Sequence, residues 1–109
     1  MNIMVTFSFR QFGDNLGTRQ LGEIAREKLL PMLDGKEKVI LDFTGIDVVS
    51  NSFADECIAK LLVEMPLETL KERTTFKGLN SMAEMCVLTA IKRRYASLHS
   101  APINPNQNS

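Results

Sequence analysis

The sequence predicts an α/β domain with a mostly parallel sheet, in which strands and helices alternate in the order β-α-β-α-β-α. Three short segments rich in β-branched and aromatic residues, at 3–9, 39–43 and 74–79, are separated by longer segments with apolar residues at helical spacing. The chain has 109 residues, of which 44% are hydrophobic and 24% are charged, so it can form one domain with its own core. We expect residues 1–98 to form that domain.

The first strand and the first helix are indicated by a change of periodicity. Every second residue from Ile3 to Phe9 is apolar, which is typical of a half-buried strand. Glycines and an Asp-Asn pair then predict a loop at 12–17. Thr18 is expected to cap a helix, and Pro31 is expected to end or kink this helix at Leu30.

The second strand and its following helix carry the clearest signals. Residues 39–43 are nearly all apolar, which predicts a central strand covered on both faces. A loop is expected over 44–51, and Ser52 is expected to cap the next helix, with Asp55 completing a box-like start. The buried stripe of this helix is expected to contain Phe53, Cys57, Ile58, Leu61, Leu62 and Met65. Pro66 should stop it and open a short turn of helix.

The third strand and the last helix are indicated less strongly. Residues 74–79 predict a weaker strand, and Asn80 or Ser81 is expected to cap the helix that follows. Its apolar face is expected to contain Val87, Leu88, Ile91 and Tyr95. The last ten residues have no charged side chain and include two prolines and three asparagines, so we expect a disordered tail over 99–109.

The composition excludes several classes of protein. Thirteen basic and thirteen acidic residues balance, which gives no indication of a nucleic-acid partner or of an anionic membrane. No apolar run reaches the roughly 20 residues of a membrane span, and the N-terminus lacks a signal-peptide pattern, so we expect a cytoplasmic protein. Cys57 and Cys86 occupy apolar helical positions and are expected to be buried thiols. Without a CxxC motif or a Cys/His cluster, we expect no metal and no other cofactor. The oligomeric state is left open.

Three features suggest alternative chemistry. The loop at 13–19 could sense a nucleotide or another small ligand, because Arg19 lies in a first helical turn that favours anions, but the loop lacks P-loop and dinucleotide-binding signatures. Asp42 and Asp47 could act as catalytic carboxylates, but no histidine, reactive cysteine or nucleophile motif accompanies them, so we do not expect an enzyme. The run Lys92-Arg93-Arg94 is expected to be a solvated helix end or, alternatively, a docking patch for an acidic partner.

The junction between the second strand and its helix is the main candidate for function. Ser50 and Ser52 flank Asn51 where the helix begins. A phosphoryl group on either serine would meet free backbone amides and the positive end of the helix dipole, so its charge would be tolerated. Capping of the helix by Ser52 would explain the same residues without a functional role.

The same residues support a resemblance to a known family. The segment 39–45 followed by Ser50-Asn51-Ser52 is similar to the STAS domain of anti-sigma factor antagonists. Over roughly residues 3–95, the chain more closely resembles the bacterial STAS-like family of unknown function. That resemblance rests on Gly17-Thr18-Arg19, on an L-D-F-x-G strand end and on the helix start Ser52 to Glu56.

The resemblance implies a regulatory module that works by protein contact. In STAS domains, the loop after this strand carries a phosphorylatable serine or threonine, and a kinase with a histidine-kinase-type ATPase fold recognises that surface. Here the phosphosite position falls on Asn51, which cannot be phosphorylated. Ser50 or Ser52 could take the role, or the domain could bind its partner without a switch.

We therefore expect a non-enzymatic protein-protein interaction module. By resemblance, the partner would be a histidine-kinase-type ATPase or a sigma-factor regulator. The expected binding surface is the 44–52 loop with the exposed face of the next helix, and its candidate residues are Thr44, Asp47, Ser50, Asn51, Ser52, Asp55, Glu56 and Lys60.

Overall fold

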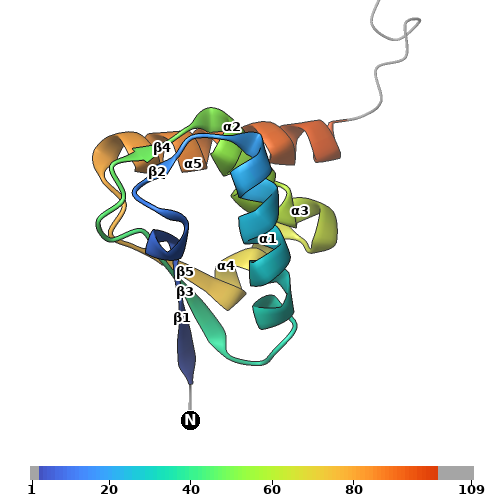
Figure 1. Cartoon of the computed structure of the whole chain (residues 1–109). Helices are drawn as coiled ribbons and strands as arrows, with labels where there is room; N and C mark the ends of the chain where they lie inside the picture. The colour runs from blue at the N-terminus through green and yellow to red at the C-terminus, as the bar shows by residue number, and fades with distance from the viewer. Residues whose placement is uncertain (1–2, 101–109) are drawn as a thin grey trace, which may run out of the picture.

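The computed structural model describes residues 3–100, which form a parallel sheet and the helices packed on it (Figure 1). The sheet consists of β1 (Met4–Ser8), β3 (Lys38–Asp42) and β5 (Thr74–Lys77), in the order β1-β3-β5. All strands are parallel, with Val5 beside Val39 and Val39 beside Thr74. The predicted α/β class with a mostly parallel sheet is confirmed.

A second, very small sheet lies where the sequence predicts only loops. It pairs β2 (Asn15–Leu16) in parallel with β4 (Val48–Val49). Leu16 and Val49 are buried, so each short strand directs one side chain into the core. The predicted element order is therefore incomplete, because a two-residue strand is too short to produce a periodic pattern.

The helices account for most of the remaining chain. They are α1 (Arg19–Leu33), α2 (Asn51–Phe53), α3 (Leu61–Glu64), α4 (Leu67–Arg73) and α5 (Ser81–His99), with a 3-10 turn η1 (Phe9–Phe12) and a π-helix η2 (Ala54–Ala59). Thr18 caps α1 and Asn80 caps α5, as predicted. The predicted tail at 99–109 begins at the last residue of α5, and residues 101–109 lie outside the described residues.

Of the two outcomes expected at Pro31, an end or a kink, the end of α1 at Leu30 is wrong, because the helix continues through Pro31 to Leu33. A proline inside a helix removes one hydrogen bond to the carbonyl four residues earlier. Here both Pro31 and Glu27 are exposed, so water can solvate that carbonyl. The continued helix then buries Leu33 in the core.

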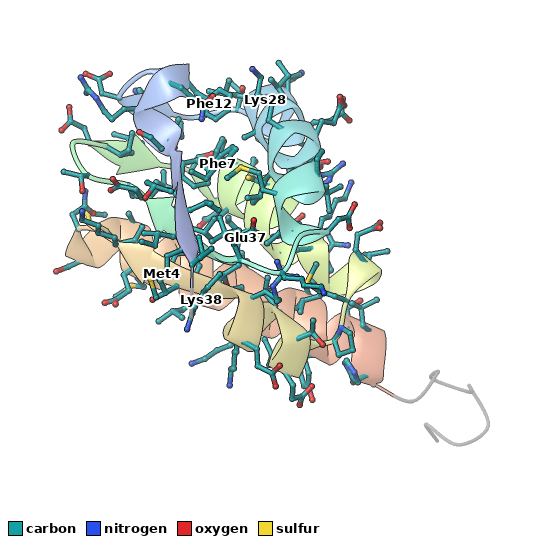
Figure 2. All side chains as sticks on the ribbon, turned by 90° about the horizontal axis from the view of Figure 1, so that it is seen from below. Met4, Phe7, Phe12, Lys28, Glu37 and Lys38 are labelled. Atoms are coloured by element: carbon teal, nitrogen blue, oxygen red, sulfur yellow. The ribbon has the colours of Figure 1, made fainter. Side chains whose placement is uncertain are left out.

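The central strand β3 is covered on one face only, contrary to the expectation of two buried faces. Val39 and Leu41 are buried, whereas Ile40 and Asp42 are only half-buried. Ile40 lies in register between Thr6 and Thr75, and Met4 pairs with Lys38 on the same face (Figure 2). The apolar run at 39–43 therefore predicts the central position of β3 correctly, but the prediction that both faces of this strand are buried is wrong.

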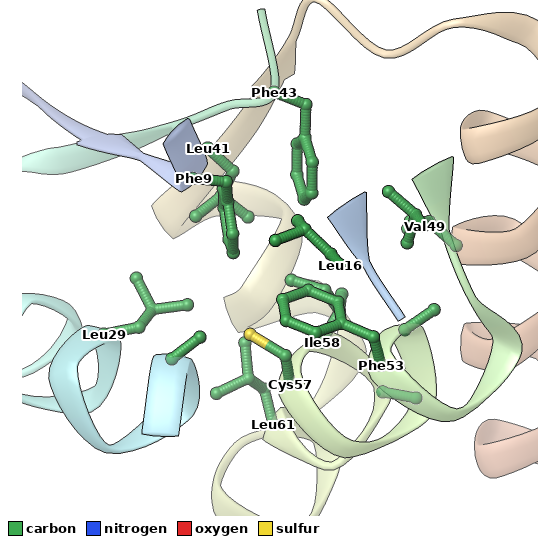
Figure 3. Packing of buried hydrophobic residues seen from close by; sticks show 14 of the residues in the cluster. Phe9, Leu16, Leu29, Leu41, Phe43, Val49, Phe53, Cys57, Ile58 and Leu61 are labelled. Carbon is green, nitrogen blue, oxygen red and sulfur yellow. The ribbon is translucent and has the colours of Figure 1, made fainter. Parts of the chain in front are cut away.

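Aromatic rings form the centre of the core (Figure 3). Phe9 stacks on Phe43 with ring centroids 4.0 Å apart, and Phe53 meets Phe9 edge-on at 6.1 Å. Cys57 is fully buried against this group, which confirms its predicted burial. The prediction for Cys86 on α5 is wrong, because this residue is only half-buried.

Candidate functional site

The helix α2 begins two residues earlier than the sequence suggests. Ser50 has the extended conformation of a cap (φ −78°, ψ 161°), and its Oγ accepts a hydrogen bond of 3.0 Å from the amide of Phe53. The amide of Ser50 in turn donates to the carbonyl of Leu16 in β2. Capping by Ser52 is therefore wrong, because Ser52 is the second residue of α2 and Asn51 is the first. Within residues 3–100, the Ser52 hydroxyl makes no hydrogen bond.

The loop before α2 is held by contacts from several elements. Thr44 donates from its amide (2.9 Å) and its hydroxyl (2.6 Å) to Oδ1 of Asp42. The amide of Asp47 donates to the carbonyl of Asp14, and the Asn80 side chain donates to the carbonyl of Asp47. Thr44 and Asp47 are both exposed on a loop that the neighbouring segments hold in place.

An open hollow of about 300 Å³ lies beside the start of α2. Its residues come from α1, from the α2–η2 segment and from α5, and they are Arg19, Asn51, Ser52, Asp55, Thr89, Ala90 and Arg93. The hollow therefore brings together three of the predicted partner-binding residues. The others, which do not line it, are Thr44, Asp47, Ser50, Glu56 and Lys60.

Asp55 links α1 and α5 at the floor of this region. Its Oδ2 accepts from Arg94 at 2.7 Å and from Arg19 at 3.0 Å, and its Oδ1 accepts from Nε of Arg94 at 3.3 Å. Partial burial opposes ionisation of Asp55, but the hydrogen bonds from Arg94 and Arg19 outweigh it and lower the pKa of the carboxyl. Asp55 therefore positions two arginines rather than standing free for a partner.

Glu56 is buried, so its prediction as an exposed partner contact is wrong. Its carboxylate accepts from Arg26 at 2.6 Å, from Arg19 at 2.9 Å and from Lys60 at 3.0 Å. Burial opposes ionisation, but these three cations outweigh it and lower the pKa of Glu56 to about 2. A sequence signal for this burial exists, because Glu56 follows the buried Phe53 by three residues and so shares its helical face.

A glycine explains how α1 comes so close to this carboxylate. A Cβ on Gly22 would lie 2.9 Å from Cβ of Glu56 and 3.1 Å from the carbonyl oxygen of Phe53. Any larger residue would therefore push α1 away from η2. The π-helical turn places the amide of Lys60 on the carbonyl of Asp55, five residues earlier. Such local widening of a helix is frequent at functional sites.

The combined cluster carries excess positive charge. Its two carboxylates, Asp55 and Glu56, face four paired cations, Arg19, Arg26, Lys60 and Arg94. Arg93 adds a fifth cation on the hollow, where it is exposed and forms no ion pair within the described part of the chain. The basic run at 92–94 is therefore more than a solvated helix end.

The alternative sites are only partly assembled. Asn15–Leu16 pairs with β4, so this part of the 13–19 loop forms a strand rather than a phosphate-binding loop, and Arg19 alone of that loop lines the hollow. The hydroxyl and the amide of Thr44 lower the pKa of Asp42, which is the opposite of the raised pKa that a general acid requires.

Groups of metal-ligating side chains and membrane-spanning helices are both absent from residues 3–100. No group of three or more His, Cys, Asp or Glu side chains there is placed to hold a metal ion. No helix in that part of the chain has the length and apolar character to cross a membrane.

The comparison with protein families gives one match. The model of the STAS-like domain of unknown function (DUF4325) matches residues 22–84, which is more than half of the chain. The matched region contains β3, the whole α2–η2 segment and the carboxylates Asp55 and Glu56, whereas Arg19, Arg93 and Arg94 lie outside it. Neither the comparison with curated proteins nor that with solved structures gives a match. The chain belongs to the family of STAS-like domains of unknown function.

Proposed function

We propose that this STAS-like domain is a non-enzymatic regulatory module that binds a partner protein through the hollow beside α2. The observation that carries this proposal is the placement of the hollow. It lies at the helix start where the STAS resemblance puts the regulatory loop, and Arg19 and Arg93 border it from α1 and α5. Thr44, Asp47 and Lys60 would contribute as outer contacts of the same surface.

The charge of this surface suggests the chemistry of the partner. With five cations around two carboxylates, the region attracts a negatively charged group. Arg93 is exposed and can form a new ion pair without breaking one among residues 3–100. Exposed charges of this kind mainly raise the rate of association and make it dependent on salt. The partner would therefore present an acidic side chain or a phosphoryl group to the hollow.

Phosphorylation of the domain itself would act on the same surface. Ser52 is the better candidate of the two serines, because it borders the hollow, whereas the Oγ of Ser50 already accepts the capping hydrogen bond. A phosphoryl group on Ser52 would add about two negative charges beside Arg19 and Arg93. It would occupy the cations that we assign to the partner and so weaken binding.

The STAS resemblance suggests a histidine-kinase-type ATPase or a sigma-factor regulator as the partner. The test is to purify the ATPases of this type from the same genome and to measure their binding to the domain by calorimetry, with and without ATP. Arg93→Glu should weaken the complex by about tenfold or more, and Ser52→Asp should weaken it in the same direction. Lys28→Glu, an equal charge reversal on the exposed side of α1, is the matched control.

Two results would contradict the proposal. If Arg93→Glu and Ser52→Asp both keep wild-type affinity for a partner that binds, the hollow is not the interface. If none of these ATPases and no sigma-factor regulator from the same genome binds, the assigned partner class is wrong.

A small anionic ligand is the second candidate for the same place. The hollow has about 300 Å³, at the lower end of the usual range for ligand sites, and Arg19 and Arg93 could hold a phosphate. Calorimetric titration with ATP, GTP and their diphosphates would distinguish the two functions. Nucleotide binding that Arg93→Glu abolishes, in the absence of any protein partner, would favour the sensor.

A further inference from the structure

A second, chemically different concavity lies along β5. It has a volume of about 440 Å³ and runs between α4 and α5 at the edge of the sheet. Its residues are Leu67, Leu70, Lys71, Thr74, Thr75, Phe76, Leu88, Ile91 and Lys92. None of them lines the hollow beside α2, so this groove is an independent site.

The groove exposes an unpaired strand edge. Within the described residues, β5 pairs with β3 alone and is the last strand of the sheet (Figure 1). The carbonyl of Lys77 accepts from the amide of Phe43, so the backbone groups of Lys77 face β3. Because these groups alternate along a strand, the N–H and C=O of Phe76 face the open edge. The amide of Thr74 is already bonded to the carbonyl of Leu70. Phe76 therefore offers one free donor and one free acceptor.

The floor of the groove is apolar. Leu70 is buried, and Leu67, Phe76 and Ile91 are half-buried. Leu88, which the sequence assigns to the apolar face of α5, is 48% exposed at the groove. A single exposed leucine is ordinary in a folded protein, but here it adjoins four other apolar side chains and a free strand edge.

The charges at the groove have one sign. Lys71 on α4 and Lys92 on α5 line it, and no carboxylate does. Neither lysine forms an ion pair within residues 3–100. A second copy of this chain, pairing edge to edge, would bring two more lysines to the same place. Charge complementarity therefore favours a partner that carries carboxylates next to apolar side chains.

We propose that this groove binds an extended, acidic and apolar segment of a partner protein, which joins the sheet as a strand beside β5. Backbone bonds to Phe76 would fix the register of the segment, and its apolar side chains would cover Leu88 and Ile91. Its carboxylates would pair with Lys71 and Lys92. Strand addition to an open sheet edge is an established mode of peptide recognition.

The test uses a synthetic peptide with alternating valine and threonine between pairs of glutamates, and a matched peptide with lysines in place of the glutamates. The wild-type domain should bind the glutamate peptide about tenfold or more tightly than the lysine peptide, as measured by fluorescence anisotropy. The double variant Lys71→Glu/Lys92→Glu should reverse this preference, which simple unfolding cannot do. Lys28→Glu should leave the preference unchanged, because Lys28 lies on α1, on the opposite side of the molecule from α4 and α5 (Figure 2).

Amide hydrogen exchange tests the mode of binding. The exchange of the Phe76 amide should slow by about tenfold when the glutamate peptide is bound. If the glutamate peptide binds without slowing the exchange of the Phe76 amide, strand addition is wrong. If the wild-type domain does not prefer the glutamate peptide, or if Lys71→Glu/Lys92→Glu does not reverse that preference, selection by charge is wrong. Dimerisation in sedimentation equilibrium that Leu88→Asp abolishes would assign the groove to a second copy of the chain and overturn the proposal.

Discussion

The Glu56→Gln variant removes the buried charge on which Arg26, Arg19 and Lys60 converge. The folded-state pKa of about 2, against an ordinary value of 4.5, corresponds to about 3 kcal/mol of stability at pH 7. Breaking a buried ion pair by removing one partner typically costs about 3–5 kcal/mol, which agrees with this figure. We therefore expect the free energy of unfolding of Glu56→Gln to be about 3 kcal/mol lower than that of the wild type.

The loss should depend on pH in a defined direction. Folding lowers the pKa of Glu56, so its stabilisation is fully present above about pH 4.5 and disappears as the pH falls towards 2. At pH 3, about 1 kcal/mol of the difference between wild type and variant should remain. A neutral glutamine has no such dependence, so the two stability curves should converge in acid.

Urea denaturation followed by circular dichroism at pH 7, 5 and 3 measures this difference directly. Glu27→Gln, on the exposed side of α1, is the matched control and should change stability by less than about 0.5 kcal/mol. A loss below about 1 kcal/mol for Glu56→Gln at pH 7, or a difference that stays constant down to pH 3, would refute the reasoning.

Three further predictions concern the residues that shape the site. Ser50→Ala should cost about 1 kcal/mol because it removes the α2 cap, whereas Ser52→Ala should cost less than about 0.5 kcal/mol; equal losses in urea denaturation would contradict this assignment. Gly22→Ala, which stabilises an ordinary helix, should here destabilise by about 1–3 kcal/mol because the added Cβ meets η2, and a raised melting temperature would be the contrary result. Cys86 should react with a thiol reagent in the native state well before Cys57, whose burial raises its pKa to about 12; fast labelling of both would show that the core opens.

Much of the fold follows from local patterns in the sequence. Alternation placed β1, the apolar run placed β3, and side-chain oxygens at Thr18 and Asn80 placed two helix starts. These features depend on residues close in the chain. The pairing of β2 with β4 depends instead on segments 33 residues apart, so no local pattern could have revealed it.

The candidate site was only partly predictable for the same reason. The sequence indicated the segment 50–52, in which Ser50 caps α2 and Asn51 and Ser52 line the hollow. It also indicated the anion-favouring position of Arg19, which lines the same hollow. It assigned the cap to Ser52 because the S-x-x-D pattern fits that residue, but Ser50 is the residue that the bond to β2 holds in the extended conformation. Capping patterns that overlap by two residues need a tertiary contact to decide between them.

The basic run on α5 illustrates how a charge pattern can mislead. Lys92, Arg93 and Arg94 are adjacent in sequence, yet successive residues of a helix point about 100° apart. In the structure, Lys92 lines the apolar groove, Arg93 lines the hollow and Arg94 is bound to Asp55. The run is therefore not one patch but a contribution to two surfaces and one internal ion pair. Replacing the whole run would disturb all three at once, so each proposed surface has to be judged by the single residue that belongs to it.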